Sequence, residues 1–431
     1  MTATLETPRV LDADWLRELA FAAGADDVGL VALDQPGLEE EAERMRAAFP
    51  AAQTFVAFVV RMNRESVRSP LRSVANRTFH DAGHEAERVA AKLVRALEDQ
   101  GVGAVNPSMA FPMEMDAFPE RGWVVSHKRV AQAAGLGVMG LHRNLIHPRY
   151  GNFILLGTVA VDRPADAQGA PLDDSPCMGC NLCAAACPVG AVASDGHFDF
   201  QACYTHNYRE FMGGFVDVLG DIAESRSRAD LEQRLPMGDA VSLWQSLTYG
   251  ANYKAAYCMS VCPAGDDVIG PYLDDKRGFV DRVVRPLRDK EETLYVLKDS
   301  DAAFFAAKRH PHKQQRVVRS GLAPRTISSF LRYADVAFQR KRARDVKLRL
   351  HFTFTGATER LATISIAEGE LTVQDEHRGE RDAHVRVDAA TWLAIVAGRA
   401  SPVWAVVRGK LWIQGPISAL TTFQSCFAGA S

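Results

Sequence analysis

Four cysteines within one short stretch predict an iron–sulfur cluster. They follow one another at intervals of two, two and three intervening residues, and a proline comes directly after the fourth: Cys177, Cys180, Cys183, Cys187 and Pro188. Cysteine thiolates at these spacings ligate a cubane cluster, because the short loops let the backbone wrap around several of its corners. A zinc site usually takes two ligand pairs separated by a longer loop, and disulfide frameworks belong to short secreted chains. The stretch therefore indicates electron-transfer chemistry.

A second group of cysteines lies downstream. In two-cluster ferredoxins the fourth cysteine of such a run ligates the other cluster, so a partner motif is expected. The chain supplies Cys258 and Cys262, with Cys203 between the two motifs. Seven of the eight cysteines lie between 177 and 262, whereas Cys426 stands apart and is expected to be a buried thiol in the last helix. The sequence predicts two clusters.

Three further side chains are candidates for catalysis. A reductase that acts on an electrophilic carbon or oxygen needs a proton donor beside its electron path. Tyr150 is a candidate donor, or else a structural tyrosine that supports the strand after it. His127 and Lys128 open a predicted helix, where a cation can bind a substrate carboxylate or phosphate; the alternative is a solvated helix start.

The composition describes an ordinary globular chain. Of its 431 residues, 24% are charged and 47% hydrophobic, and the formal net charge of −3 gives no global electrostatic reason to bind nucleic acid. No apolar run approaches the ~20 residues that a membrane helix needs. The first residues show neither the basic region nor the apolar core of a secretion signal. We therefore expect a cytoplasmic protein, with thiols reduced and available to iron, no nucleic-acid partner and no membrane span.

Hydrophobic periodicity places these groups on alternating helices and strands. Apolar residues at helical spacing predict helices over 12–24, 38–48, 81–99 and 127–134. Apolar runs predict strands over 28–33, 54–60 and 153–161. Such alternation indicates an α/β sandwich over residues 1–165. Residues 166–290 then carry the cysteines among short helices and turns.

The spacing of Gly135, Gly137 and Gly140 matches a dinucleotide fingerprint, G-x-G-x-x-G. That fingerprint needs a strand before it and a helix after it, so that a phosphate lies at the helix N-terminus. Here the glycines follow a predicted helix, and Gly135 is better explained as its C-terminal cap. We predict no nicotinamide site from this motif.

The pattern changes near Ile327. Residues 291–325 are mixed in character and are predicted to form a linker. An apolar helical face follows from Ile327 to Phe338, and strict alternation then predicts strands, around 348–354, 362–366, 371–373, 385–387 and 411–413. Helices are expected over 391–397 and around Leu420. These elements indicate a separate α+β domain over 326–431.

The region before and through the first cysteine motif resembles the superfamily of iron–sulfur and corrinoid reductases that contains epoxyqueuosine reductases and reductive dehalogenases. The matching residues run over 127–137, 147–162 and 177–188, within a similarity over about residues 12–270. The resemblance implies a nitroreductase-like α/β domain that holds cobalamin, beside a ferredoxin-like domain that feeds it electrons. Gly135, Gly137 and Gly151, in the Ala-Gly-Leu-Gly and Pro-x-Tyr-Gly motifs, are then candidates for cofactor binding. No Asp-x-His-x-x-Gly motif is present, so a corrinoid would bind without a histidine from that motif.

The resemblance also divides the cysteines between the two clusters. The first cluster takes Cys177, Cys180, Cys183 and Cys262. The second takes Cys187, Cys203 and Cys258, and Ala255 stands where the pattern has a fourth cysteine. The second cluster is therefore either a 3Fe-4S centre or a 4Fe-4S centre with another ligand. Three residues near in sequence are candidates for that ligand: His206, Tyr253 and Tyr257.

The residues from 327 on resemble a sterol carrier protein type 2 domain, on the segments 388–398 and 409–415 and the terminal helix. In that family a sheet and helices enclose an apolar tunnel for lipids or acyl groups. The alternative is a structural or dimerisation module without a pocket, because apolar strands look alike whether they line a core or a cavity.

Together these predictions describe an α+β multidomain protein that acts as an iron–sulfur-dependent reductase, assisted by a corrinoid, on an apolar, lipid- or steroid-like substrate. A ferredoxin or flavodoxin would supply electrons, and a homodimer is considered. Two alternatives stay open: an electron-transfer and lipid-binding adaptor, and a cobalamin-free enzyme that binds substrate at the incomplete second cluster. Epoxyqueuosine reduction itself is not expected, because residues 120–123 replace the Asp-Ser-Ala-Pro segment whose aspartate is the proton donor in those enzymes.

Overall fold

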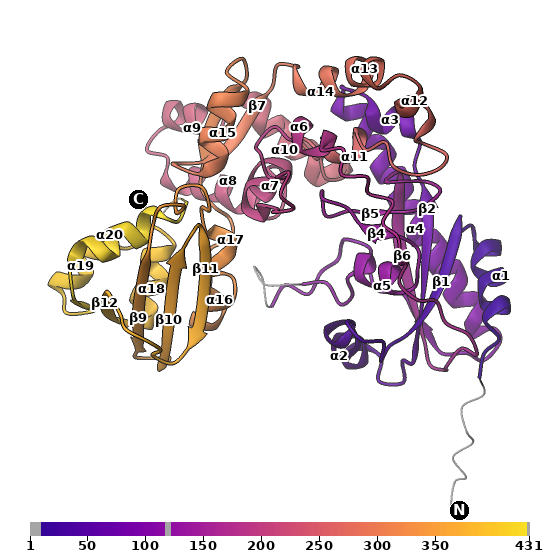
Figure 1. Ribbon diagram of the computed structural model, residues 1–431, viewed down its shortest axis with the longest axis horizontal. Coiled ribbons are helices and arrows are strands. Elements are labelled where there is room, and N and C mark those ends of the chain that lie inside the picture. Colours follow the sequence, from indigo (N-terminus) through magenta and orange to yellow (C-terminus); the bar gives the residue numbers. More distant parts are fainter. Residues whose placement is uncertain (1–9, 117–121, 429–431) are drawn as a thin grey trace, which may run out of the picture. The chain divides into compact units, whose positions relative to one another are not determined.

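The computed structural model describes residues 10–116 and 122–428 and separates into two compact units (Figure 1). The first unit consists of three segments, Met1–Cys187, Val192–Phe198 and Ala256–Lys290. The second unit consists of the segments Pro188–Ala191, Asp199–Ala255 and Glu291–Ser431. The cysteine-bearing stretch 166–290, predicted as one domain, is therefore shared between the two units. Residues 120 and 121, part of the segment compared with Asp-Ser-Ala-Pro, lie outside the described residues.

The first unit is built on a four-stranded sheet with the order β1-β2-β6-β3, in which each neighbouring pair is antiparallel. Its strands are β1 (Asp27–Ala32), β2 (Thr54–Arg61), β3 (Ala104–Val105) and β6 (Ile154–Val161). The strands predicted over 28–33, 54–60 and 153–161 are confirmed to within one residue at each end.

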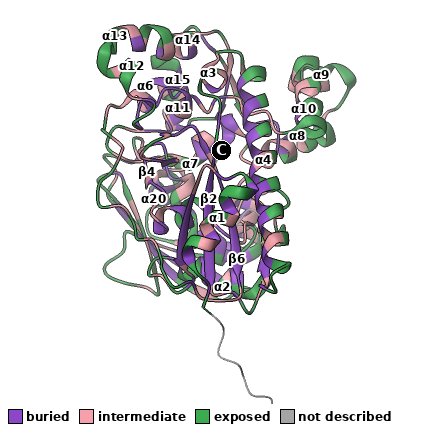
Figure 2. Ribbon diagram, turned by 90° about the vertical axis from the view of Figure 1, so that its right-hand side faces the viewer, coloured by how far each residue is buried: buried purple, intermediate pink, exposed green. Residues whose placement is uncertain are grey.

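Helices cover both faces of this sheet. In β2, Phe55 and Val59 lie in the core shared with α2 (Glu39–Ala48) and α5 (His127–Ala133). The intervening residues Val56 and Phe58 lie in the core shared with α1 (Ala13–Ala23) and α4 (Arg72–Glu98). Successive side chains of a strand point to opposite faces, so two helical layers explain why β2 is buried from Thr54 to Val60 (Figure 2). This is the layered arrangement that the alternation of elements predicted.

Two helices of the first unit bear directly on the predictions. α4 begins at Arg72 and not near 81, because its first turns also bury apolar residues such as Ala75 and Phe79. α5 ends at Ala133, and Gly135 follows with a left-handed φ of 81° while the Leu136 N–H donates to Ala131 O (2.9 Å). The prediction that Gly135 caps this helix is confirmed.

The remaining elements of the first unit are short. They are α3 (Arg64–Arg68), β4 (Val138–Met139), β5 (Leu145–Ile146), α6 (Leu182–Ala186), α11 (Tyr257–Ser260), α12 (Gly270–Asp274), α13 (Lys276–Phe279), the π-helix η1 (Val280–Val284) and α14 (Arg285–Arg288). The prediction of short helices and turns around the cysteines agrees with α6 and α11 in this unit.

The second unit begins with helices and a small parallel pair of strands. Its helices are α7 (Phe200–Asn207), α8 (Gly213–Glu224), α9 (Arg228–Arg234) and α10 (Met237–Tyr249). The prediction of a linker over 291–325 is wrong, because this stretch forms β7 (Thr293–Leu297), α15 (Asp301–Arg309) and β8 (Gln314–Val318). Leu294 and Val296 are buried, and the buried Lys313 pairs with Glu292 (2.5 Å). Polar residues on β8 concealed the strand pattern.

The carboxy-terminal part of the second unit is a five-stranded sheet covered by helices on one face. Its order is β11-β10-β9-β12-β13, and only β9 and β12 run parallel within the described sheet. The strands are β9 (Leu348–Thr355), β10 (Arg360–Ala367), β11 (Glu370–Asp375), β12 (Ala383–Asp388) and β13 (Leu411–Gln414). The helices are α16 (Ile327–Arg332), α17 (Ala334–Ala337), α18 (Ala389–Val396), α19 (Pro402–Val407) and α20 (Ile417–Ser425).

This part confirms the predicted α+β pattern, with one break. The helical face expected from Ile327 to Phe338 divides at Tyr333 into α16 and α17. The core packs Trp392 of α18 against Phe352 of β9 (5.1 Å between ring centroids). Cys426 is fully buried directly after α20, and its Sγ donates to Thr422 O (3.3 Å), as predicted for a buried thiol. None of the described helices is long and apolar enough to cross a membrane.

Candidate functional site

Left-handed backbone turns shape the loop of the first three cysteines. Cys177 and Cys180 lie in the loop before α6, and Cys183 lies in the first turn of that helix. Gly179 (φ 66°) and Asn181 (φ 59°) turn the loop between them. A Cβ at Gly179 would meet no atom within 4 Å, so glycine is favoured there by its conformational freedom and not by crowding.

Cys262 completes a group of four thiols. It lies just after α11, and its thiol interacts electrostatically with those of Cys177, Cys180 and Cys183. Cys177 also packs against the small apolar cluster that Cys262 forms with Ile146 and Ala264. These are the four cysteines that the resemblance assigned to the first cluster, and all of them belong to the first unit.

Burial opposes the ionisation of two of these thiols, Cys183 and Cys262. It raises the pKa of Cys262 to about 12 and that of Cys183 to about 12, and the neighbouring thiols act in the same direction. The thiols of Cys183 and Cys262 are therefore protonated near neutral pH when no metal is bound, and their ionisation requires a compensating positive charge. Metal binding supplies such a charge and displaces the protons.

Four thiolates are the donor set that a cubane cluster needs. The described residues contain no group of three or more His, Cys, Asp or Glu side chains that could hold one metal ion. A 4Fe-4S cluster distributes its four thiolate ligands over separate iron atoms, so they need not converge as closely as around a tetrahedral zinc. The four thiols, held in short loops and partly or fully buried, fit such a cluster.

A second pair of thiols lies in the same unit. Burial raises the pKa of Cys258 to about 12, the thiols of Cys187 and Cys183 act in the same direction, and the charge of Lys128 opposes them. Cys203 lies in α7 of the second unit. A second cluster on Cys187, Cys203 and Cys258 stays a prediction.

The position without a cysteine and its predicted substitutes all have protein contacts. Ala255 is buried, and its N–H donates to Asn207 Oδ1 (3.0 Å). The predicted substitutes contact other side chains or backbone: His206 Nδ1 accepts from the Tyr295 N–H (3.3 Å), Tyr253 packs against Phe211 (5.5 Å between centroids), and Tyr257 lies under the Arg72 guanidinium (5.2 Å). These contacts give each residue a structural role, and their role as iron ligands stays a prediction.

Arg68 of α3 is a residue that the sequence did not single out. Its guanidinium lies over the rings of Phe153 (5.1 Å) and Phe279 (5.4 Å) and interacts electrostatically with Cys262. Its Nε and Nη2 atoms are buried, with no hydrogen-bond partner among the described residues. Arg68 Nη1 also pairs with Glu65 Oε1 (3.2 Å), whose side chain is exposed, so the charge of Arg68 is partly compensated. The remaining positive charge beside Cys262 opposes the negative charge that a cluster brings. No local motif reveals it, because α3 and Cys262 are far apart in sequence.

His127 and Lys128 occupy different surroundings although they are neighbours. His127 is buried, its Nδ1 lies 2.8 Å from Thr158 Oγ1 and its Nε2 lies 3.0 Å from Ser108 O. Burial lowers the pKa of His127, so it is a neutral core side chain and not the cation predicted at a helix start. Lys128 Nζ donates to Arg143 O (2.9 Å) and Asn144 Oδ1 (2.7 Å), which ties α5 to the turn before β5. A catalytic role for Lys128 stays a prediction.

Tyr150 packs within a group of rings and cations. It stacks on His147 (4.7 Å between centroids), and the guanidinium groups of Arg61 (5.3 Å) and Arg149 (5.1 Å) lie over its ring. Its hydroxyl donates weakly to Asp26 O (3.4 Å). These contacts favour the structural alternative, and its role as proton donor stays a prediction.

The three glycines predicted to bind a cofactor pack against backbone of their own unit. A Cβ at Gly135, Gly137 or Gly151 would clash with a carbonyl oxygen: that of Ala170, Ile146 or Ala264, respectively. All three also have positive φ. Close packing therefore explains glycine at each position, and the space beside their Cα atoms is filled by protein. These residues do not fit a corrinoid on that side.

Comparison with known proteins matches part of the chain to epoxyqueuosine reductases. The enzyme of Burkholderia pseudomallei (strain K96243) is 33% identical over 125 residues, which cover 26% of this chain and 30% of that enzyme. The enzyme of Staphylococcus aureus (strain NCTC 8325 / PS 47) is 34% identical over 91 residues, which cover 21% of this chain and 23% of that enzyme. Residues 335–428 match the SCP-2 sterol transfer family. The predicted resemblance is confirmed.

The similarity to these two epoxyqueuosine reductases is limited to part of each enzyme, because the chain spans less than a third of the length of either one. A crystal structure of selenomethionine-labeled epoxyqueuosine reductase superposes with a TM-score of 0.33 at 17% identity, covering 46% of this chain and 60% of that chain. A TM-score this low does not establish a common fold. Both curated relatives bear the name of a reductase, the class of enzyme that the sequence predicted.

Proposed function

We propose that the chain is an iron–sulfur-dependent reductase whose first cluster is held by Cys177, Cys180, Cys183 and Cys262. The observation that carries the proposal is the group of four electrostatically coupled thiols within one unit. Partial similarity to enzymes named epoxyqueuosine reductase supports a reductase. A 4Fe-4S cluster in this position supplies one-electron transfer when bound.

The surrounding residues prepare this position for electron transfer. Burial of Cys183 and Cys262 keeps water from two of the four sulfur ligands, and Arg68 places a positive charge beside Cys262. Cys177 and Cys180 are only partly buried, and Met178 between them is 42% exposed. We propose that a ferredoxin or flavodoxin docks at this exposed part of the loop, because electron transfer requires a short distance between the two redox centres.

The substrate of the proposal is apolar, lipid- or steroid-like, because residues 335–428 match a sterol transfer family. The net charge of −3 supports a substrate other than a nucleic acid. The resemblance is the only basis for predicting cobalamin in this chain. Since protein backbone fills the space beside Gly135, Gly137 and Gly151, no step is assigned to a corrinoid.

Single-turnover reoxidation of the anaerobically reduced protein tests the proposal. Reduced protein is mixed with a panel of apolar epoxides, aryl halides and enones, the loss of the reduced-cluster spectrum is followed, and products are identified by mass spectrometry. If the chain is a reductase, one of the compounds reoxidises its cluster and is converted to a stoichiometric amount of product in the absence of any other protein. A protein that stays reduced with every compound, yet passes its electrons to a second redox protein, is the adaptor and contradicts the proposal. Cobalt assayed on the same samples decides whether a corrinoid is present.

A further inference from the structure

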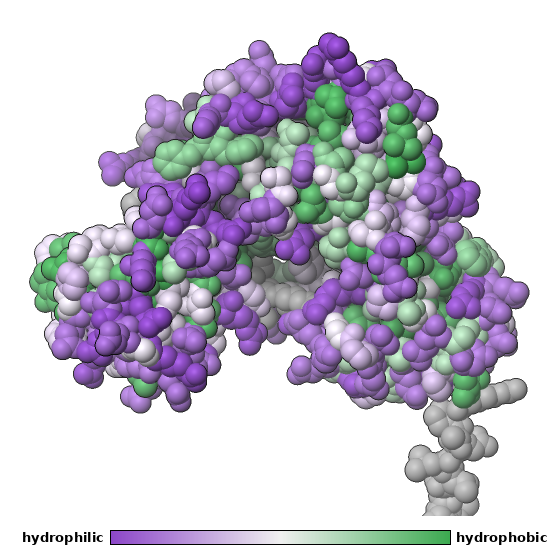
Figure 3. Space-filling view, in the orientation of Figure 1, coloured by the Kyte–Doolittle hydropathy of each residue, from purple (hydrophilic) through white to green (hydrophobic). Residues whose placement is uncertain are grey.

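Helix α19 reverses the usual relation between hydrophobicity and burial. Among its six residues only Ala405 is buried, whereas Val403 is 70%, Trp404 61%, Val406 48% and Val407 68% exposed. Figure 3 shows hydrophobic residues at the edge of the molecule where Figure 1 places α19. The nearby helix α18 behaves normally, because its large residues Trp392 and Ile395 are buried. Soluble surfaces seldom gather several large apolar side chains without a binding role.

The backbone of α19 is anchored, so this exposure belongs to the folded state. Ala405 lies in the main core of the carboxy-terminal part, and Leu411 that follows is buried in the same core. The Gly409 N–H donates to Val406 O (2.9 Å) and the Lys410 N–H donates to Ala405 O (2.9 Å). These bonds close the helix C-terminus and turn the chain into β13. The exposed side chains are therefore presented on a fixed element.

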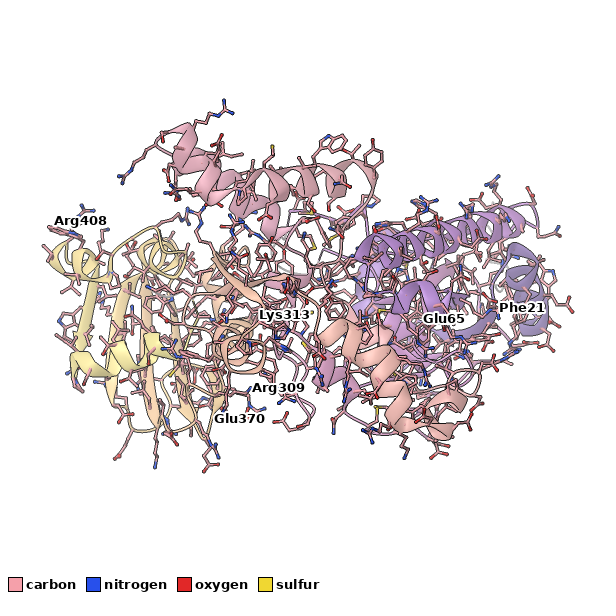
Figure 4. The ribbon with its side chains drawn as sticks, turned by 90° about the horizontal axis from the view of Figure 1, so that it is seen from above. Phe21, Glu65, Arg309, Lys313, Glu370 and Arg408 are labelled. Atoms are coloured by element: carbon pink, nitrogen blue, oxygen red, sulfur yellow. The ribbon has the colours of Figure 1, made fainter. Side chains whose placement is uncertain are left out.

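Positive charge surrounds these apolar side chains. Arg399, Arg408 and Lys410 flank α19 and are exposed, and Figure 4 shows Arg408 projecting outward. No Asp or Glu follows Asp388 in the sequence, although the whole chain has a net charge of −3. Asp388 itself lies near Lys410, whose charge contributes to lowering the pKa of that carboxyl after its hydrogen bonds with Thr391. Residues 389–428 thus combine exposed tryptophan and valine with three cations and no carboxylate side chain of their own, and Asp388 lies near one of these cations.

This combination selects an anionic lipid surface over another copy of the chain. Apolar side chains enter the boundary between headgroups and acyl chains, where tryptophan is favoured, and cations bind anionic headgroups. Two copies joined through the same patch would place like charges opposite one another, since an isologous interface pairs a surface with itself. We propose that α19, with Arg399, Arg408 and Lys410, docks this chain on an anionic bilayer surface. The inference does not depend on the proposed reductase function.

Sedimentation of the full chain with vesicles tests the proposal. Vesicles of phosphatidylcholine alone are compared with vesicles of phosphatidylcholine and phosphatidylserine in equal parts. The protein is expected to sediment with the anionic vesicles, less with the neutral ones, and less again as salt is raised. The double variant Trp404→Ser/Val407→Ser is expected to lose about tenfold or more in affinity, and Arg408→Gln/Lys410→Gln to lose the preference for anionic vesicles.

The matched control is Trp244→Ser. Trp244 is 55% exposed on α10, which carries Asp239 and no Lys or Arg, so this substitution should leave vesicle binding unchanged. All variants change exposed residues, and their circular dichroism and iron content verify folding. The proposal is overturned if the wild-type chain ignores anionic vesicles, or if the Trp404→Ser/Val407→Ser variant binds them equally well. A wild-type dimer in solution that becomes a monomer in this variant would also overturn it, because α19 would then join two copies.

Discussion

The cysteine site of the first unit and helix α19 of the second depart from ordinary burial in opposite ways. Ionisable thiols are buried at the first, and apolar side chains are exposed on the second. At the cysteine site, thiols that must ionise to bind iron are buried: Cys183 and Cys262 are each 7% exposed. On α19 apolar groups are shown to solvent, with Val403 and Val407 about two thirds exposed or more (70% and 68%). Burial opposes the ionisation of the thiols, which metal binding would compensate, and water opposes the exposure of the apolar side chains of α19, which a lipid surface would relieve. Binding sites in this chain are therefore expected where the burial of a side chain does not match its chemistry.

The largest effect is expected from removing one ligand of the proposed cluster. Cys262→Ser takes away the only one of the four thiols that lies outside the first motif, so the cluster should be lost and iron per chain should fall sharply. Iron and acid-labile sulfide on anaerobically purified protein measure this. Cys426→Ser is the matched control, because it also removes a buried thiol and should leave iron unchanged. Equal iron in both variants would contradict the assignment of Cys262.

The second prediction contrasts α18 with α19 in stability. Trp392 is 2% exposed and packs against Phe330, Phe352 and Phe423, so Trp392→Ala should lower the free energy of unfolding by about 3–5 kcal/mol. Urea denaturation followed by circular dichroism measures the change. A loss below about 1 kcal/mol would show that this core is loosely packed and would weaken the contrast.

The third prediction concerns pH. Burial, and then the charge of Lys128, lower the pKa of His142 from 6.5 to about 4. The unfolded chain therefore binds this proton first, so stability is full above pH 6.5 and is lost as pH falls from 6.5 to about 4, by about 3 kcal/mol at most. The urea midpoint of the first unit should fall less steeply over this range in His142→Gln than in the wild type. Identical pH dependence in the two proteins would show that His142 does not cause it.

The fourth prediction concerns the cation beside Cys262. Arg68→Gln removes a buried positive charge, which should favour the oxidised cluster and lower the midpoint potential. An effect of about tenfold in the ratio of reduced to oxidised cluster corresponds to ~59 mV for a one-electron couple. A redox titration followed by electron paramagnetic resonance measures it, with iron content verifying that the cluster is present. Arg64→Gln on the same helix is the control, because Arg64 is exposed and should shift the potential less.

The smallest effect is expected on α19 itself. Val407→Ser should change the free energy of unfolding by no more than about 0.5 kcal/mol, because the side chain is 68% exposed in the folded chain. The same urea experiment as for Trp392→Ala measures it. A large loss of stability would mean that Val407 packs in the folded protein, and α19 would then no longer contrast with the cysteine site.

The sequence predicted what local spacing determines. Periodicity predicted β2, β6 and the strands of the carboxy-terminal sheet, because this pattern repeats within a few residues. Ligand spacing predicted the cysteines of the first motif as iron ligands, and that assignment stays a prediction. The prediction of a linker over 291–325 was wrong because β8 lacks an alternation of apolar residues. This strand is largely exposed and carries Gln314, Gln315 and Arg316.

What depends on distant contacts could not be predicted in this way. Arg68 reaches Cys262 only through the fold, and the pKa of His127 is lowered because the folded chain buries this side chain, which the local sequence does not show. The exposure of α19 could not be predicted either, because the sequence alone does not show which way Val403, Trp404 and Val407 face.

We propose that four thiols of the first unit, those of Cys177, Cys180, Cys183 and Cys262, hold a 4Fe-4S cluster. Low-temperature electron paramagnetic resonance of the anaerobically purified, dithionite-reduced protein tests it most directly, with iron and sulfide measured on the same sample. The account predicts the rapidly relaxing signal of a reduced 4Fe-4S cluster, retained in Cys426→Ser and lost in Cys262→Ser. A protein that contains zinc or isolated iron without labile sulfide, and gives no such signal, would contradict it.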